Sequence, residues 1–230
     1  MSTVKVAAVS DLHGNLSFAV PQCDILAIAG DLCPVRESHH PKHQQRWLDR
    51  TFYPWCAKQL TSGVGNIVFT PGNHDFVFER PRTPAVPERV TCLIDSETTV
   101  CGLRIYGTPW TPLFGAWAFM TWESRLKEKF SRIPGGLDIL LSHGPAYGLC
   151  DKILMPAWAG CSDGNLGSTE LRAAVERAKP AWLFCGHIHS GEHSAVECGP
   201  TKAVNVSLVD EEYFKVYDVF ISDLEGKGQC

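Results

Sequence analysis

The sequence predicts an α/β fold, and two patterns along the chain support this prediction. Short apolar runs, which are typical of strands buried on both faces, alternate with polar or helical segments. Five of these runs end in a short polar segment that carries Asp, Asn or His beside Gly. Because ligands of open α/β sheets bind outside the carboxyl ends of the strands, the second pattern also predicts where a functional site lies.

Five apolar runs predict the buried strands of this fold. They cover residues 4–10, 25–29, 66–70, 138–142 and 181–185. Each is short and has no helical period, which favours strands that have packing partners on both faces.

Further strands are expected outside these five runs. Residues 100–106 predict a hairpin that turns at Gly102, and the C-terminal part of the chain predicts strands at residues 203–208 and 213–221.

Two segments predict helices. Residues 41–60 carry apolar side chains at helical spacing, and Pro54 is expected to kink or divide this helix because proline removes a backbone hydrogen bond. Residues 169–178 predict a second helix, which Ser168 caps and Pro180 ends.

Composition and charge limit the possible functions. The chain has 230 residues, of which 44% are hydrophobic and 20% charged, and this predicts a single domain over residues 1–230. A formal net charge of −4 provides no basic surface for a long nucleic acid, although a small nucleotide remains possible. No apolar run approaches the roughly 18 residues that span a membrane.

The cysteines and the N-terminal residues bear on the compartment. The chain has ten cysteines and no CxxC pair, and its first residues lack the features of a secretory signal. Most cysteines lie in or beside apolar runs, which favours reduced, buried thiols in a cytoplasmic protein.

The predicted strand ends bring carboxylate, amide and imidazole side chains to one edge of the fold. Five segments carry them: Asp11-Leu12-His13, Gly30-Asp31, Gly72-Asn73-His74-Asp75, Ser142-His143 and Gly186-His187-Ile188-His189. Taken singly, each segment could be an ordinary polar turn or a buried histidine bonded to backbone. All five in order, each at a strand end, indicate a metal site.

The ligand types indicate which metals are expected. Seven mixed oxygen and nitrogen ligands are too many for one tetrahedral zinc, and they suit a two-metal site with ions about 3.5–4 Å apart that share a carboxylate. The donor set favours Mn, Fe, Zn, Co or Ni over calcium or an oxygen-only magnesium site. A two-metal site of this kind activates a bridging water for in-line attack at phosphorus.

This series of motifs resembles the calcineurin-like metallophosphoesterase superfamily from residue 4 to about residue 191. The chain is similar in size to the metallophosphoesterase-domain-containing group, which resembles class III cyclic nucleotide phosphodiesterases, rather than to purple acid phosphatases. Residues 106–110 and 205–207 also look like that group. The resemblance implies a four-layer αββα sandwich with two mixed β-sheets.

The resemblance also implies a role for each motif residue. It assigns seven residues to two divalent ions, with Mn favoured: Asp11, His13 and His189 to the first, Asp31 as the bridge, and Asn73, His143 and His187 to the second. His74 would face the phosphate and protonate the leaving oxygen or stabilise developing charge. Asp75 would orient the His74 ring.

One motif departs from the protein phosphatases of the superfamily, which continue it as Gly-Asp-x-x-Asp-Arg-Gly. Here the sequence reads Gly30-Asp31-Leu32-Cys33-Pro34-Val35-Arg36, without the second Asp and the Arg at their positions. Together with the resemblance to the metallophosphoesterase-domain-containing group, whose members include cyclic nucleotide phosphodiesterases, this departure implies a phosphodiesterase acting on small or cyclic nucleotides, through in-line attack by a hydroxide that bridges two metal ions. A phosphomonoesterase acting on proteins or small molecules stays open, as does a non-catalytic binding or scaffold protein.

Two further groups of residues have more than one interpretation. In the aromatic segment 114–122, Phe119 and Trp122 are expected to pack on the sheet at the start of a helix, whereas Trp110 or Phe114 could instead contact a base or line a pocket. The histidines at positions 39, 40 and 43 are expected to form a surface cluster at the helix entrance, with extra metal ligands as the alternative.

Overall fold

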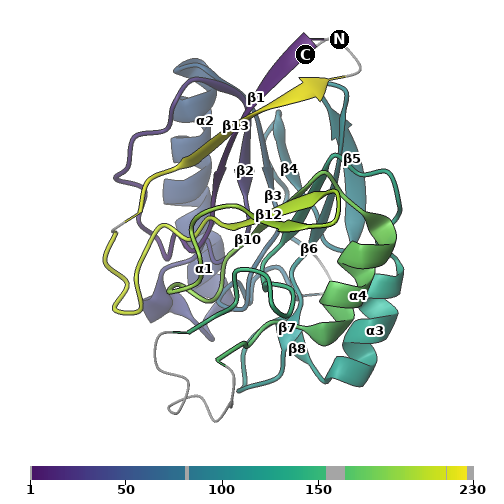
Figure 1. Ribbon diagram of the computed structural model, residues 1–230. Helices are drawn as coiled ribbons and strands as arrows, with labels where there is room; N and C mark the ends of the chain where they lie inside the picture. The colour runs from purple at the N-terminus through teal and green to yellow at the C-terminus, as the bar shows by residue number, and fades with distance from the viewer. Residues whose placement is uncertain (1, 81–82, 154–163, 216, 227–230) are drawn as a thin grey trace.

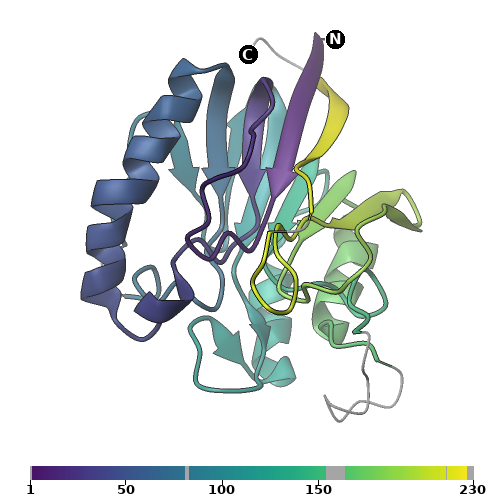
Figure 2. The ribbon, with the colours of Figure 1, turned by 90° about the vertical axis from the view of Figure 1, so that its left-hand side faces the viewer.

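The computed structural model describes residues 2–80, 83–153, 164–215 and 217–226. Two β-sheets pack face to face, and helices cover the outer face of each sheet (Figures 1 and 2). This arrangement confirms the predicted αββα sandwich with two mixed sheets.

The first sheet has five strands in the order β13-β1-β2-β3-β4. These are β1 (Ser2–Val9), β2 (Cys23–Ile28), β3 (Val64–Phe69), β4 (Val90–Cys92) and β13 (Phe220–Gly226). Strands β1 to β4 are parallel, and β13 is antiparallel to β1. The three strands predicted for this sheet from the N-terminal part of the chain are therefore confirmed.

The second sheet has six strands in the order β11-β12-β10-β9-β6-β5. These are β5 (Ser96–Val100), β6 (Leu103–Thr108), β9 (Ile139–Ser142), β10 (Trp182–Cys185), β11 (Val196–Cys198) and β12 (Thr201–Asn205). The predicted hairpin at Gly102 joins β5 and β6. A separate parallel pair, β7 (Thr111–Pro112) and β8 (Met120–Thr121), was not expected from the sequence.

Helices cover both outer faces. The first sheet is covered by α1 (Pro41–Trp47), the π-helical turn η2 (Leu48–Phe52) and α2 (Tyr53–Thr61), preceded by the 3-10 turn η1 (Val35–Glu37). The second sheet is covered by α3 (Glu123–Ser131) and α4 (Thr169–Ala178). None of the helices in the described ranges has the length and the apolar sequence that a membrane span requires.

The interruption of the first predicted helix and the start of the second both have causes in the local sequence. The helical segment is divided at η2, just before Pro54, which lacks the amide hydrogen that would close the next α-helical turn. Helix α4 has its predicted bounds, and Oγ of Ser168 accepts a hydrogen bond of 3.1 Å from the amide of Leu171.

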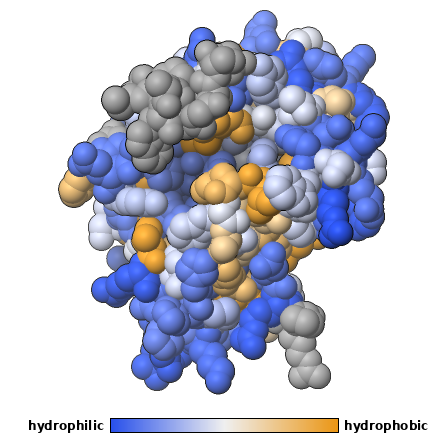
Figure 3. Space-filling view, turned by 90° about the horizontal axis from the view of Figure 1, so that it is seen from below, coloured by the Kyte–Doolittle hydropathy of each residue, from blue (hydrophilic) through white to orange (hydrophobic). Residues whose placement is uncertain are grey.

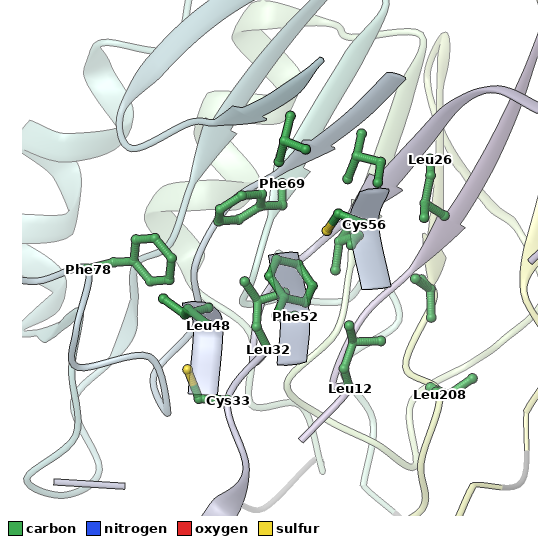
Figure 4. Close-up of a cluster of buried hydrophobic side chains, with 14 of the residues drawn as sticks. Leu12, Leu26, Leu32, Cys33, Leu48, Phe52, Cys56, Phe69, Phe78 and Leu208 are labelled. Atoms are coloured by element: carbon green, nitrogen blue, oxygen red, sulfur yellow. The ribbon is translucent and has the colours of Figure 1, made fainter. Parts of the chain in front are cut away.

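Alternate residues of the strands face two different apolar layers. Val6 and Ala27 pack between the two sheets, whereas the residues adjacent to them in the strands pack against the covering helices. Figure 4 shows this outer layer, in which Phe52 and Cys56 of the helical segment meet Phe69 of β3. A third layer packs α3 and α4 on the second sheet. Burial on both faces explains why the strands appear in the sequence as uninterrupted apolar runs.

Three predictions are corrected by the structure. The strand expected at residues 213–221 is wrong, because Tyr213 has a left-handed φ of 65° within a turn and the strand begins only at Phe220. The strand expected at residues 203–208 is shifted, since β12 ends at Asn205. Phe119 is buried as expected, but Trp122 is 66% exposed at the N-terminus of α3.

The cysteines follow the expectation with one exception. Seven of the described cysteines are free thiols, five of them buried. Cys101 is disulfide-bonded, so the prediction of reduced thiols is wrong at this position.

Candidate metal centre

The five predicted polar segments follow β1, β2, β3, β9 and β10 at one end of the sandwich. Within each sheet these strands run parallel, and in Figure 2 the arrows of the parallel strands point to the lower side. The loops of the two sheets are joined there, because the amide of Ser10 donates to the carbonyl of Val206 at 2.7 Å. The predicted site residues therefore gather where the two sheets meet.

Four of these residues lie in left-handed backbone conformations. The φ angles are 54° at Asp11, 44° at His13, 52° at Asp31 and 70° at His187. Residues other than glycine rarely adopt this conformation, and those that do cluster at functional sites. Asp11 and His13 thus converge through a tight loop beyond β1, not through an extended strand.

Two glycines of the motifs are required by close packing. Gly30 has a φ of 106°, and a side chain there would overlap the ring of His143. A side chain at Gly72 would overlap the carboxylate of Asp31. The glycines let the loops of both sheets approach the same point.

Asp31 lies at the centre of the site. Its Oδ2 atom is 3.4 Å from Nε2 of His143, 3.7 Å from Nε2 of His13 and 3.9 Å from Nε2 of His74. Its other oxygen accepts a hydrogen bond of 2.7 Å from the amide of His74. One carboxylate oxygen therefore faces three imidazoles.

Asp11 makes the corresponding contacts on the other side. Its Oδ1 atom is 3.4 Å from Nε2 of His189 and 3.9 Å from Nε2 of His13. The Oδ2 atom accepts hydrogen bonds from the hydroxyl of Ser207 at 2.6 Å and from the amide of His187 at 3.0 Å. These two contacts fix the carboxylate so that Oδ1 faces the imidazoles.

Among the described residues, three overlapping groups could hold a cation: Asp11 with His13 and His189, His13 with Asp31 and His74, and Asp11 with Asp31 and His143. Asn73 adjoins the third group, since its Oδ1 lies 2.8 Å from Nε2 of His143. The ring of His187 lies 5.1 Å from that of His143 and is in none of the three groups. His74, expected to face substrate only, is in one of them.

The residues present fit divalent cations. Within the described part of the chain, the buried carboxylates of Asp11 and Asp31 pair with histidines and not with lysine or arginine. Nδ1 of His13 is buried and has no hydrogen-bond partner among the described residues. Buried carboxylates are normally paired or coordinate a metal, and mixed oxygen and imidazole donors suit transition metals.

Buried charge pairs shift the pKa values of the site. Burial alone raises the pKa of Asp31, but the charges of His143 and His74 outweigh it and hold this pKa well below its usual range. Burial lowers the pKa of His143, yet the charge of Asp31 raises it to about 9. Asp11 and His189 form a second such pair, in which the pKa of Asp11 is lowered and that of His189 is raised to about 9 against burial.

The other two imidazoles are held neutral. Burial is the main cause that lowers the pKa of His13 to about 4. Burial and then the charge of His143 lower the pKa of His187 to about 3. Neutral imidazole is the form that binds metal, so these two side chains need no proton removed.

The surroundings of His74 include three residues that the motifs did not indicate. Oγ of Ser38 lies 3.0 Å from Nδ1 of His74, and the amide of Gln44 donates to the His74 carbonyl at 2.6 Å. The ring of Trp117 packs 4.4 Å from the imidazole. Ser38 and Gln44 precede His74 in the sequence by 36 and 30 residues, so no local sequence pattern could have identified them.

The role expected for Asp75 is wrong. Its carboxylate accepts hydrogen bonds from the amides of Gly72 at 2.9 Å, Leu32 at 3.0 Å and Cys33 at 2.9 Å. Asp75 therefore ties the loops after β2 and β3 together, and Ser38 takes the place at the His74 ring.

The structure also places the three histidines and the two aromatic residues for which the sequence left two interpretations open. His39, His40 and His43 are exposed at the start of α1 and belong to none of the cation groups, which confirms the surface cluster. Nε1 of Trp110 donates to Asp95 at 2.8 Å, a packing role. Phe114 is 63% exposed and lies 5.4 Å from the ring of His187.

Comparisons with known proteins agree on one family. The calcineurin-like phosphoesterase family matches residues 4–191. Metallophosphoesterase domain-containing protein 1 of Homo sapiens is 30% identical over 239 residues, which cover 96% of this chain and 71% of the relative.

Solved structures share the fold at low sequence identity. The protein TT1561 of Thermus thermophilus has a TM-score of 0.54 at 14% identity and covers 89% of each chain. Phosphopantetheinyl hydrolase from Mycobacterium tuberculosis has a TM-score of 0.52 at 15% identity, over 91% of this chain and 90% of the other. By its motifs, its fold and these matches, the chain belongs to the calcineurin-like phosphoesterase family.

Proposed function

We propose that the protein is a dinuclear metal-dependent phosphodiesterase that acts on small or cyclic nucleotides. The observation that carries this proposal is the meeting of Asp11 and Asp31 with the Nε2 atoms of His13, His143 and His189. Two buried carboxylates that face several imidazoles, with no lysine or arginine partner in the described ranges, are best explained by bound cations.

The three cation groups indicate how the ligands divide. Oδ2 of Asp31 lies 3.7 Å from Nε2 of His13 and 3.4 Å from Nε2 of His143, so this one oxygen would bridge two ions. Asn73 and His187 complete the proposed set beside His143. Bound divalent cations would polarise the phosphoryl group and activate water for attack.

His74 would assist the leaving oxygen. When the imidazole carries a proton on both nitrogens, Nδ1 donates to the Ser38 hydroxyl oxygen 3.0 Å away, and Nε2, the atom 3.9 Å from Asp31, holds the second proton. A proton held there can pass to an oxygen that leaves phosphorus. The Trp117 ring, tilted by 34° to the imidazole with centroids 4.4 Å apart, restricts the imidazole to this orientation.

The charges around the site favour a diester. A dianionic monoester attracts cationic clamps in addition to the metals, and arginine is the usual choice. The five motif segments contain no lysine or arginine. Arg36, the nearest candidate in sequence, is 82% exposed and lies 3.7 Å from Glu37. The positive charge of the two metal ions, without a further cationic clamp, suits the single negative charge of a diester.

The test compares kcat/KM for bis-p-nitrophenyl phosphate and p-nitrophenyl phosphate with Mn²⁺ supplied. We expect the diester to be preferred. A monoester preference of about tenfold, or about 1.4 kcal/mol of transition-state stabilisation, would contradict the diesterase function and leave the metal site standing.

A further inference from the structure

A cavity of about 400 Å³ lies beside the group formed by Asp11, His13 and His189. Its lining includes His13, Asn15, Val35, Arg36, Trp47 and Tyr213. The volume falls within the roughly 300–1,000 Å³ of small-molecule pockets. None of the described residues that line it carries a carboxylate, and its one arginine, Arg36, is 82% exposed beside Glu37, so the cavity suits an uncharged group.

Tyr213 is the aromatic wall of this cavity nearest the metal ligands. Its ring centroid lies 4.7 Å from that of His13 and 5.5 Å from that of His189, in both cases edge to face. The side chain is nevertheless 44% exposed. Figure 3, a view onto the face that holds the strand ends, shows apolar surface gathered near its centre between hydrophilic regions. Because Tyr213 is 44% exposed and contacts His13, its ring offers a ligand an aromatic surface at the edge of the metal centre.

A strained turn holds Tyr213 in this position. Its φ of 65° is unusual for a bulky aromatic residue. Oδ1 of Asp210 accepts hydrogen bonds from the amides of Glu212 at 3.0 Å and Phe214 at 2.9 Å, and the Tyr213 amide donates to the Asp210 carbonyl at 3.0 Å. Backbone strain that is maintained by surrounding bonds commonly serves a site.

The same turn is bonded to a proposed metal ligand. The carbonyl of Asp210 lies 2.8 Å from Nδ1 of His189 and accepts its hydrogen bond. The position of Tyr213 is therefore fixed relative to the ions that His189 would help to bind, which is what a wall for part of the substrate requires.

The lining also indicates which part of the substrate enters. The cavity is lined by His13 and not by His74, the residue proposed to assist the leaving oxygen. Trp117 lies on the side of His74, with ring centroids 4.4 Å apart. The ring of Tyr213 is also closer to that of His13, at 4.7 Å, than to that of His74, at 6.4 Å, so we assign the cavity to the ester arm that stays on phosphorus.

We propose that this cavity, with Tyr213 as its stacking wall, binds the retained ester arm of the substrate and selects a planar heteroaromatic group such as a nucleobase. The proposal rests on the phosphodiesterase function proposed above. Stacking of a base on an aromatic side chain is worth about 1–3 kcal/mol, which corresponds to a selectivity of about 5- to 150-fold.

The experiment uses two diesters that share one leaving group. Thymidine 5′-monophosphate p-nitrophenyl ester and methyl p-nitrophenyl phosphate both release p-nitrophenolate, and only the retained arm differs. We expect the wild type to show a kcat/KM at least about fivefold higher for the thymidine ester. Tyr213→Leu should lower this ratio by the same factor, and Tyr213→Phe, which keeps the ring, should preserve it.

Phe214→Leu is the matched control, because Phe214 is the next residue in the turn, is exposed and does not line the cavity. It should keep the wild-type ratio. An equal loss on both substrates in Tyr213→Leu would mean that Tyr213 only supports the imidazoles, and this would overturn the proposal. A wild-type ratio near one would overturn it as well.

A binding measurement separates this proposal from the proposed function. Thymidine 5′-monophosphate and methyl phosphate are titrated calorimetrically into wild type and Tyr213→Leu with Mn²⁺ present. Tighter binding of the nucleotide to the wild type, by about tenfold and lost in Tyr213→Leu, would support the cavity even if neither diester is hydrolysed. Equal binding of both ligands to the wild type would overturn it whatever the activity.

Discussion

Oγ of Ser38 lies 3.0 Å from Nδ1 of His74, and both side chains are buried. The serine belongs to none of the five motif segments. It follows the turn η1, at the entrance to α1, and approaches the imidazole from the side of the covering helices. The orientation of the proposed proton donor thus depends on a segment outside the strand-end loops.

Ser38→Ala should lower kcat for diesters with poor leaving groups by about three- to tenfold, since a net hydrogen bond is worth about 0.5–1.5 kcal/mol. Metal content should not change. The alkaline limb of the pH–rate profile, on which a general acid loses its proton, should move to lower pH, because Nδ1 loses the hydroxyl oxygen that accepts its hydrogen bond. Ser38→Thr, which keeps the hydroxyl, should restore the wild-type profile; an unchanged profile in Ser38→Ala would remove Ser38 from the mechanism.

His74→Ala should lower kcat by about 10²–10⁴, the usual contribution of general acid–base catalysis. The loss should be smaller for substrates with a good leaving group, because these need no proton. Metal stoichiometry, measured by plasma emission on the purified variant, should equal that of the wild type. Loss of one ion would instead show that His74 is a ligand through its group with His13 and Asp31.

Asp31→Asn should abolish activity and reduce the metal content, because its Oδ2 atom faces the imidazoles of both His13 and His143. Asp49→Asn is the matched control, since Asp49 is exposed in η2. Activity near the wild-type level in Asp31→Asn at full metal loading would contradict the bridging assignment.

Metal binding should release protons. His143 and His189, each with a pKa raised to about 9, are protonated at neutral pH before a cation binds, and imidazole must lose its proton to become a ligand. Mn²⁺ added to chelator-treated protein near neutral pH should therefore release close to two protons per chain, measured by pH-stat titration. His13 and His187, with lowered pKa values, should release none.

The same shifts predict how stability depends on pH in chelator-treated protein. A histidine whose pKa rises from 6.5 to about 9 on folding stabilises the fold fully below 6.5, and this contribution is lost as the pH passes about 9. The Tm should therefore fall between these two values. A constant Tm across this interval would mean that the two pairs are not ionised in the folded state.

The sequence predicted the central strands and the meeting of the motif residues because both follow from topology. Asp11 and His189 lie far apart in the chain, but parallel strands bring their ends to one edge. Ser38 and Tyr213 could not be predicted in this way. Each lies in an irregular segment, and its position depends on long-range packing or on a left-handed turn that no local period encodes.

The two sheets contribute different chemistry to the centre. The loops of the first sheet provide both carboxylates, Asp11 and Asp31, whereas the proposed ligands from the second sheet, His143, His187 and His189, are all imidazoles. A cation held by both sets would act as a cross-link between two halves of the sandwich that are otherwise joined mainly by apolar packing. Loading with metal should then make the two sheets unfold as one unit, and sliding between them would be resisted at the very point where the chemistry takes place.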